Sequence, residues 1–402
     1  MKMDNLFERS LSAIPCGSQT YSKSHKYFTH PFFASHGEGA VLYDTNDKPY
    51  DDYSMALGAV ILGYKSKAWL QSLNIPDGFN FSAPHPLEVE LAEKLISIIP
   101  SAEMVKFFKN GSDATEIAVR LARAYTGRKT VVSFGYHGFH DWYVSAIDKN
   151  NGVMPNDHIQ NRIPDTKHFN CQDIAAVILE PAHPDTLKIV EQARRYGILI
   201  IFDEVLTGFR YDIGGYQKIL GITPDLSCFG KCMANGLPLS AVVGRRDIMQ
   251  MMDSGGVFAS STFGGETLSL AAALKTINEL ERNKDTLWEI GGRWANNMKG
   301  LIESKGLTNI MRLEGLAPRC GVVFNDKAGI TAIEYQSLYQ QELLKRGILT
   351  HGMNNFCLAH TEEQIDYFIE CADTVLNTLK KARDEGTVRG YLERTIQVAF
   401  RR

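Results

Sequence analysis

Residues 198–210 read ILIIFDEVLTGFR, and this stretch decides the fold class. A continuous apolar run leads directly into two carboxylates, Asp203 and Glu204, which is typical of a buried parallel strand that ends where its sheet opens. Parallel strands need long crossover connections, which are usually helices. The stretch therefore predicts an α/β protein whose functional residues gather at the carboxyl ends of its strands.

Similar apolar runs alternate with helical patterns from about residue 105 to 245, as in a mostly parallel central sheet with flanking helices. The predicted strands are 105–108, 130–134, 176–179, 198–202, 226–229 and 241–244. One predicted helix, residues 113–125, places Ile117, Leu121 and Tyr125 on one face and ends before Gly127.

The pattern changes after a long helix near residues 268–280. A helix at about 284–305, strands near 311–324 and helices near 331–346 and 361–383 predict a smaller α+β domain. The first 50 residues hold many aromatic residues and few helical repeats. We therefore divide the chain into an N-terminal arm (1–50), a large domain (51–283) and a small C-terminal domain (284–402).

The composition limits the possible partners. The 402 residues carry 43 Lys and Arg against 46 Asp and Glu, a net charge of -3 without runs of like charge, so we expect neither nucleic acid nor membrane as a partner. The seven cysteines lack paired CxxC spacing, so we expect reduced thiols and no metal site. No stretch reaches the roughly 20 apolar residues of a membrane span, and the start lacks an apolar signal core. We expect a soluble, cytoplasmic protein.

Two strand-to-helix junctions could hold an anion. Asn110, Gly111 and Ser112 follow a predicted strand and precede a helix, so they offer backbone N–H groups and a hydroxyl to a phosphate. Ser261 and Thr262, followed by two glycines and a helix, offer a second set. An ordinary helix cap would explain each junction without a ligand.

Two further junctions could hold a flat heterocycle. Tyr136 and His137 follow a strand, where an aromatic ring could stack on a ligand, although packing at an interface is the alternative for the neighbouring residues around Phe139. Asp203 could be a helix cap or a metal ligand. It could also face a pyridine nitrogen and keep it protonated, which makes the ring an electron sink, while Val205 packs on the ring.

Lys231 stands between Gly230 and a small, apolar segment directly after a predicted strand. Most lysines are solvated surface charges, but these neighbours would desolvate the amine, and a lowered pKa is what a Schiff-base lysine requires. A nucleotide-binding P-loop is excluded, because Asp225 stands where its first glycine should be and Cys232 where its Ser or Thr should be.

In order and spacing these motifs resemble those of class-III, fold-type-I aminotransferases that use pyridoxal 5′-phosphate (PLP), most closely the glutamate-1-semialdehyde 2,1-aminomutase-like branch. The resemblance covers nearly the whole chain. Its most specific parts are FDEVLTGFR and GKCMANGLPLSA, in which Lys231 follows Asp203 by 28 residues (231 − 203 = 28). NGSDATE lies upstream and STFGG downstream, in the order of the family.

The resemblance implies that Lys231 forms the internal aldimine with PLP and moves the proton, and that Asp203 pairs with the pyridinium nitrogen. Thr262 would reach the phosphate of the neighbouring subunit, so the expected assembly is a homodimer. The full set of predicted cofactor-binding residues is Gly111, Ser112, Asp113, Tyr136, His137, Asp203, Val205, Lys231 and Thr262.

Two departures from the family bear on the substrate. The aminomutase carries a carboxylate-binding arginine in its N-terminal arm, whereas this chain reads IPCGSQTYSKSHKYF there and has only Arg9 before position 30. Ser22 and Lys23 are the candidates in its place. The loop after Glu180 is also shorter than usual, which looks similar to members of the branch that act in surface-polysaccharide and amino-sugar metabolism.

These features predict an aminotransferase that moves an amino group between an amino donor and a carbonyl substrate. The alternatives are the intramolecular amino transfer of the aminomutase, a PLP racemase, and a non-catalytic regulatory protein. Glu266, close after Thr262, is a third candidate substrate contact. The polar residues without an assigned role are His140, Asp141, His351, Asn354 and His360.

Overall fold

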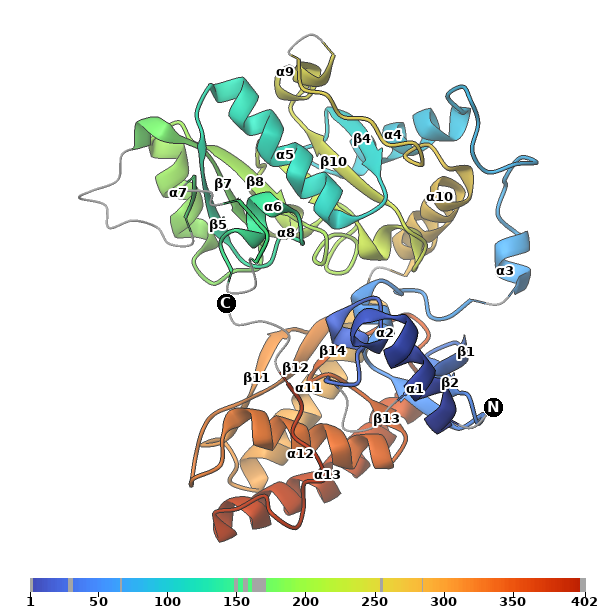
Figure 1. The fold of residues 1–402 in the computed structure, drawn as a ribbon, viewed down its shortest axis with the longest axis vertical. Coiled ribbons are helices and arrows are strands. Elements are labelled where there is room, and N and C mark those ends of the chain that lie inside the picture. Colours follow the sequence, from blue (N-terminus) through green and yellow to red (C-terminus); the bar gives the residue numbers. More distant parts are fainter. Residues whose placement is uncertain are drawn as a thin grey trace. The chain divides into compact units, whose positions relative to one another are not determined.

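The structure is a computed structural model that describes residues 3–27, 32–65, 67–147, 151–154, 158–160, 171–253, 256–283 and 285–397. The chain forms two compact units, one of Met1–Ala68 with Asp285–Arg401 and one of Trp69–Lys284 (Figure 1). We predicted a separate arm, 1–50, and placed residues 51–68 in the large domain. The structure groups both segments with the C-terminal residues.

The unit of residues 69–284 is built on a seven-stranded sheet with the order β4-β10-β9-β8-β7-β5-β6. The strands are β4 (Met104–Phe108), β5 (Thr130–Phe134), β6 (Ile159–Gln160), β7 (Ile174–Leu179), β8 (Leu199–Asp203), β9 (Leu226–Phe229) and β10 (Ser240–Gly244). Only β10 runs antiparallel to its neighbours, β4 and β9. The predicted mostly parallel α/β sheet is confirmed, and each predicted strand is present to within two residues.

Helices cover both faces of this sheet (Figure 1). The chain enters this unit through α3 (Lys67–Gln71), and its other helices are α4 (Pro86–Ile98), α5 (Gly111–Thr126), α6 (Asp141–Val144), α7 (Thr186–Arg195), α8 (Tyr216–Leu220), α9 (Arg246–Met249) and α10 (Thr267–Arg282). In β8, Ile201 packs into the cluster that contains the α5 side chains, whereas Phe202 packs into the cluster that contains those of α7. Since side chains alternate along a strand, Asp203 continues the α5 side and Glu204 the α7 side.

Helix α5 follows its sequence signals closely. Its first turn is closed by a capping box in which the Asp113 carboxylate accepts the backbone N–H of Asn110 at 2.9 Å. It ends at Gly127, whose φ of 67° is the left-handed conformation that glycine adopts most easily. The helix therefore presents its amino end next to the carboxyl end of β4.

The other unit joins the two ends of the chain. Its elements are α1 (Met3–Ala13), β1 (Ala34–Glu38), β2 (Val41–Asp44), β3 (Pro49–Asp52), α2 (Met55–Gly58), α11 (Thr286–Ser304), β11 (Met311–Leu316), β12 (Arg319–Phe324), α12 (Ala332–Lys345), β13 (Ile348–Leu349), β14 (Met353–Asn355) and α13 (Glu362–Glu385). Strand β3 pairs in parallel with β13, with Asp51 opposite Ile348, which explains why residues 51–68 belong to this unit.

The core of this unit lies under the antiparallel sheet β11-β12-β14, as expected of a small α+β domain. Trp294 of α11 is fully buried there, and its ring contacts those of two other fully buried residues, Phe356, which follows β14, and Phe368 of α13. Helix α12 contributes Tyr335 and Leu338 to the same cluster. The helices and strands predicted after residue 284 are all present.

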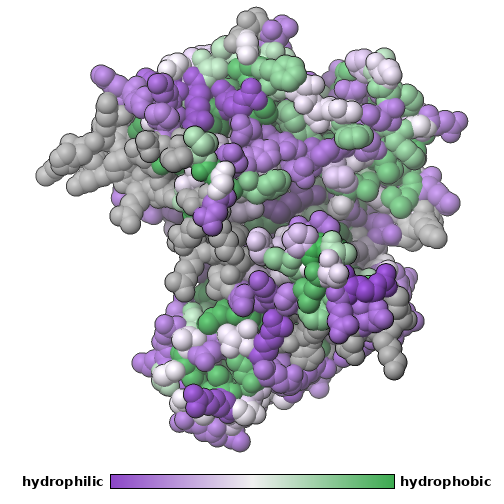
Figure 2. Space-filling view, viewed as in Figure 1, coloured by the Kyte–Doolittle hydropathy of each residue, from purple (hydrophilic) through white to green (hydrophobic). Residues whose placement is uncertain are grey.

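Hydrophilic residues cover much of the face shown in Figure 2, and hydrophobic residues lie among them in scattered patches. Within the described ranges, no helix has both the length and the apolar character that a membrane span requires. The cytoplasmic location stays a prediction.

The carboxylate of Glu204 lies on the α7 side of the sheet, where it binds backbone groups of the protein itself. It is fully buried, and it accepts hydrogen bonds from the Thr207 hydroxyl and from the backbone N–H groups of Tyr216 (2.9 Å) and Gln217 (2.8 Å) at the start of α8. Burial raises its pKa to about 7, against these hydrogen bonds, which favour the carboxylate.

We predict that Glu204→Ala lowers the free energy of unfolding by about 1–3 kcal/mol, because it leaves buried N–H groups at the start of α8 without an acceptor. Denaturant unfolding measures the change. The matched control is Glu191→Ala on α7, whose side chain is 72% exposed and whose loss should stay within about 0.5 kcal/mol. Equal stability of the two variants would contradict the assignment.

Candidate functional site

Asp203 ends β8 as a buried carboxylate, 5% exposed. Its Oδ1 accepts the backbone N–H of Val205 at 3.1 Å, and its Oδ2 lies 2.7 Å from Nδ1 of His137. A buried carboxylate is stable only when donors surround it. Asp203 is therefore held in one orientation by two groups from different segments.

The His137 ring bridges Asp203 and the end of β5. Its Nε2 lies 3.1 Å from the carbonyl oxygen of Phe134, and since a carbonyl only accepts, Nε2 carries a hydrogen. An ionised Asp203 likewise only accepts, so a charged carboxylate implies a hydrogen on Nδ1 as well. The ring therefore holds the Asp203 carboxylate in place from one side, and its other nitrogen fixes the ring to the end of β5.

The loop that carries Tyr136 and His137 is fastened at several points. Thr115 of α5 donates its hydroxyl to the carbonyl of His137 at 2.8 Å, and Glu180, at the end of β7, accepts the backbone N–H of Tyr136 at 3.0 Å. Burial, followed by the charge of Asp203, raises the pKa of Tyr136. The Tyr136 ring is 37% exposed, so it can offer a face to a ligand near Asp203.

Glu180 and Thr115 were not among the predicted site residues. Glu180 follows a strand end, which is the same signal that identified Asp203, so it could have been found. Thr115 lies one turn into α5, and nothing in the local sequence links it to a loop 22 residues later.

Segments that follow three different strands lie against the side chain of Val205. A side chain at Gly111 would place its Cβ 2.7 Å from Val205 Cγ1, too close for any residue but glycine. A Cβ at Gly230 would also touch Val205, at 3.4 Å. The start of α5, the end of β8 and the residue before Lys231 therefore meet around one valine.

The amino end of α5 is lined by Ser112, which is 7% exposed. Its hydroxyl accepts the backbone N–H of Phe139 at 3.2 Å, and Gly138 passes so close that a Cβ there would lie 2.3 Å from Ser112 Oγ. Asn110 before it is anchored by the hydroxyl of Ser240 on β10, at 2.6 Å. A helix amino end with backbone N–H groups and a hydroxyl is suited to an anion.

Lys231 begins a short turn, Lys231–Ala234, after β9, and its φ of 40° lies in the left-handed region that non-glycine residues avoid. The three residues after it are buried. Strained backbone of this kind clusters at functional sites. Arg210, itself buried, donates to Cys232 Sγ at 3.4 Å and fixes the turn one residue beyond Lys231.

Glu266 is occupied as a helix cap. Its carboxylate accepts the backbone N–H groups of Leu268 (2.7 Å) and Ser269 (3.2 Å) and forms an ion pair with Lys109 at 3.0 Å. Lys109 directly follows β4. The ion pair therefore connects the end of β4 to the loop that carries Thr262, an exposed residue. These contacts account for Glu266 without a substrate, and its role as a substrate contact stays a prediction.

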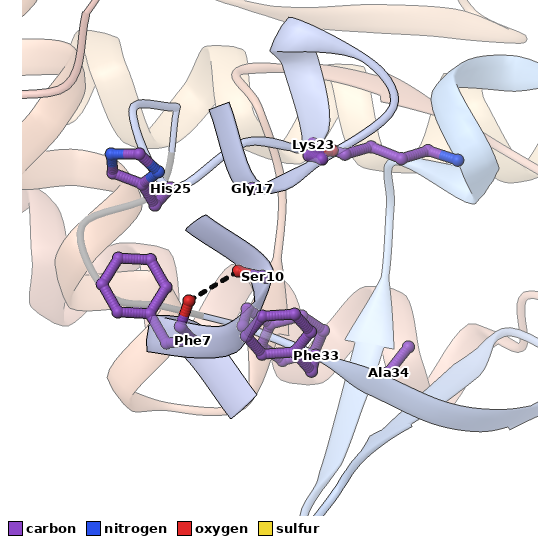
Figure 3. Close-up of a pocket in the computed structure, with 9 residues that line it drawn as sticks. Phe7, Ser10, Gly17, Lys23, His25, Phe33 and Ala34 are labelled. Atoms are coloured by element: carbon purple, nitrogen blue, oxygen red, sulfur yellow. Dashed lines mark hydrogen bonds between the residues drawn. The ribbon is translucent and has the colours of Figure 1, made fainter. Parts of the chain in front are cut away.

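The predicted residues Ser22 and Lys23 lie in the other unit, in a short 3-10 turn, Tyr21–Lys23. Lys23 lines a cavity of about 210 Å³ together with residues of α1, among them Phe7, and the side chain of Lys23 extends away from Phe7 and His25 (Figure 3). His360 is buried against Tyr53, where its Nδ1 accepts the backbone N–H of Cys357, so it serves the core.

His140 and Asp141 lie at the start of α6. His140 Nε2 is 3.5 Å from the Asp113 carboxylate that caps α5. The Asp113 side chain is therefore held by His140 as well as by the capping box of α5.

The arrangement fits a flat, phosphorylated heterocycle such as the pyridoxal phosphate that the sequence resemblance implies. The glycine at position 111 leaves the amino end of α5 open beside Val205, Ser112 adds a hydroxyl, and Asp203 is a buried carboxylate directed by His137. A carboxylate there would keep a ring nitrogen protonated.

Known proteins are similar to this chain in sequence and in fold. The model of the class-III aminotransferases matches residues 21–180 and 145–299. The 3-aminobutyryl-CoA aminotransferase of Cloacimonas acidaminovorans is 32% identical over 94% of this chain and 97% of its own. The glutamate-1-semialdehyde 2,1-aminomutase of Methanothermobacter thermautotrophicus is 31% identical over 94% of this chain and 100% of its own.

Among solved structures, the FumI protein of Sphingopyxis sp. MTA144, in its PLP internal aldimine form, superposes with a TM-score of 0.83. It is 27% identical and covers 94% of this chain and 97% of its own.

We predict that His137→Leu lowers kcat by about 10- to 100-fold, because leucine has no donor and the change removes a hydrogen bond to a charged group, worth about 1.5–3 kcal/mol. Steady-state kinetics measures the effect, and a thermal melt verifies folding. His36→Leu, a surface histidine on β1, is the control and should match the wild type. A His137 variant within twofold of the wild type would remove it from the site.

Proposed function

Because the chain belongs to the class-III aminotransferase family, we propose that it binds pyridoxal 5′-phosphate and moves an amino group from an amino donor to a carbonyl substrate. The observation that carries the proposal is the meeting of Asp203, Val205 and the amino end of α5 at one edge of the sheet, next to the turn of Lys231. When bound, the cofactor supplies an electron sink that makes the substrate α-carbon acidic.

Each residue has a distinct part in this proposal. Asp203 holds the pyridine nitrogen protonated, and His137 keeps the carboxylate oriented. Tyr136 and Val205 cover the two faces of the ring. Lys231 would bind the cofactor covalently and would carry the proton at the substrate α-carbon, and the three buried residues that follow it fix the backbone from which its side chain starts.

The remaining cofactor contacts concern the phosphate. The backbone N–H groups at Gly111 and Ser112 and the Ser112 hydroxyl would bind it, with Asp113 capping the same turn. The partial positive charge of the helix amino end favours the dianion.

We further propose a sugar-derived carbonyl substrate, as in surface-polysaccharide or amino-sugar metabolism. Two features support this class. The segment between β7 and α7 is short, from Glu180 to Asp185, which leaves room for a larger substrate. The arm turn offers Ser22 and Lys23 in place of a carboxylate-binding arginine.

Intramolecular amino transfer is the second candidate, since a relative of equal coverage carries the aminomutase name. The two reactions differ in their need for a separate amino donor. Conversion of glutamate 1-semialdehyde to 5-aminolevulinate without added donor would favour the aminomutase. Loss of the cofactor's visible band on adding an amino acid or amino sugar alone would favour the aminotransferase.

We predict that Lys231→Ala abolishes turnover and removes the visible absorbance band of the covalently bound cofactor, because no other amine replaces it. Absorbance and transamination assays of the purified variant measure both effects. An unchanged band in Lys231→Ala would contradict the assignment, as would a wild-type protein that shows no such band after incubation with the cofactor.

We also propose a homodimer in which Thr262 serves the phosphate of the partner's site. Thr262 is exposed, and its neighbour Phe263 leaves 57% of its side chain exposed, as does the nearby loop residue Phe258 at 78%. Large exposed aromatic side chains are typical of surfaces that a second copy covers.

The assembly can be tested by mixing two inactive variants. In a dimer of Lys231→Ala with Thr262→Val, one site has both Lys231 and Thr262 intact if Thr262 crosses the interface, so co-expression with two affinity tags should restore about half of the activity of the wild-type dimer. If Thr262 serves its own site, one site lacks Lys231 and the other lacks Thr262, so the mixed dimer keeps only about half of the activity of the Thr262→Val dimer.

A further inference from the structure

The loop between β5 and α6 lies directly on the first turn of α5. A Cβ at Gly138 would lie 2.3 Å from the Oγ of Ser112 and 3.0 Å from its Cα, so no side chain fits between the loop and the helix at this point. The φ of Gly138 is 107°, a conformation that residues with a side chain rarely adopt. The loop backbone therefore passes Ser112 in direct contact.

Two hydrogen bonds, one on each side of Gly138, fasten the loop to this turn. On one side, the hydroxyl of Thr115 donates to the carbonyl of His137 at 2.8 Å. On the other side, the backbone N–H of Phe139 donates to the Oγ of Ser112 at 3.2 Å. Three consecutive loop residues are thus held by two side chains that lie about one helical turn apart on α5.

The Thr115 hydroxyl has a second acceptor within its own helix. It lies 3.1 Å from the carbonyl of Ser112, a contact that threonine often makes inside a helix. The hydroxyl carries one hydrogen, and the carbonyl of His137 is the closer acceptor. Thr115 and His137 are both 1% exposed, so the bond is shielded from water. Loss of the hydroxyl would remove a donor from a buried carbonyl, which is costly.

The bond with Phe139 directs the hydroxyl of Ser112. Because the oxygen accepts the N–H of Phe139, its own hydrogen can be donated to another acceptor, and a hydroxyl that accepts one hydrogen bond donates a stronger one. Ser112 lies at the amino end of α5, where backbone N–H groups and the partial positive charge of the helix favour an anion. The loop therefore orients Ser112 as a donor to a phosphate.

The bond to the His137 carbonyl affects the other half of the site, around Asp203. The His137 ring holds the Asp203 carboxylate through Nδ1 at 2.7 Å, and its Nε2 binds the Phe134 carbonyl at 3.1 Å. The ring of Trp142 stacks on the imidazole with centroids 6.3 Å apart, and that of Tyr143 meets it edge-on at 5.5 Å. The ring can keep this direction only while the loop holds the His137 backbone in place.

We propose that Thr115 is a positioning residue that sets both halves of the cofactor site through this loop: it places the Ser112 hydroxyl for the phosphate and the His137 ring for Asp203. The inference rests on the binding of pyridoxal phosphate proposed above. Thr115 acts on the cofactor only through Ser112 and His137. All four residues belong to the unit of residues 69–284.

The test compares Thr115→Val, which keeps the shape and loses the hydroxyl, with Thr115→Ser, which keeps the hydroxyl. Thr276→Val on α10 is the control, because Thr276 is fully buried and donates to the Ala272 carbonyl of its own helix at 2.7 Å. Hydrogen exchange of the peptide of residues 134–144 measures the loop in the purified protein. We expect exchange there to rise about tenfold in Thr115→Val and to stay near the wild-type rate in the other two variants.

Cofactor binding examines the two halves separately. Titration of the cofactor-free protein with pyridoxal phosphate, and with pyridoxal, which lacks the phosphate, gives two dissociation constants for each variant. We expect Thr115→Val to bind pyridoxal phosphate about tenfold more weakly and to lose a smaller factor for pyridoxal, because pyridoxal makes no use of Ser112. Equal factors for the two ligands would mean that Ser112 is unaffected, and this would overturn the proposal.

Kinetics examines the route through His137. We expect Thr115→Val to lower kcat about tenfold in the otherwise unchanged protein, but less than about twofold in His137→Leu, where the ring is already absent. A tenfold loss in both backgrounds overturns the proposal, as do unchanged loop exchange, a kcat within about twofold of the wild type, or a Thr115→Ser variant as impaired as Thr115→Val. If Thr115→Val does not fold, Thr115→Cys replaces it, because a thiol is only a weak donor.

Failure of the proposed function would give a different result. A wild-type protein that binds neither ligand and shows no visible absorbance band would refute the binding of pyridoxal phosphate. The exchange of the peptide of residues 134–144 needs no cofactor, and it would still decide whether Thr115 holds the loop.

Discussion

The buried carboxylate of Asp203 is the constraint on which the site depends. A charged group at the end of an apolar strand is costly unless donors surround it, and here the donors are the backbone of Val205 and the ring of His137. Holding that ring in place requires the Phe134 carbonyl, and holding its loop requires Thr115 and Glu180. The position of one carboxylate thus depends on residues at the ends of three strands, β5, β7 and β8, and on helix α5.

Much of this edge of the sheet could be predicted, because each candidate site residue follows an apolar run that predicts a strand by itself. Asp203, Ser112 and Tyr136 each follow a predicted strand that the structure contains. Glycine placement was also informative, since Gly111 has no room for a side chain beside Val205. These signals are local, because each apolar run and the polar or glycine residue that follows it lie within about ten positions of the sequence.

What the sequence did not reveal are the contacts between distant segments. The pairing of β3 with β13 joins residues about 300 positions apart, so the N-terminal residues, which resemble an arm on their own, become part of the unit formed with the C-terminal residues. The bond between His137 and Asp203 and the ion pair of Glu266 with Lys109 are of the same kind. Strand β6 was missed because two residues give no periodicity.

The central claim is that Lys231, at a strained backbone position directly after Gly230, which lies against Val205, is the residue that binds pyridoxal phosphate. Borohydride reduction of the cofactor-loaded protein, followed by peptide mass mapping, tests it most directly because it traps the bond wherever it forms. The account predicts one cofactor-sized mass addition per chain, on the peptide that contains Lys231. An addition on Lys109 or another lysine, or none at all, would contradict it.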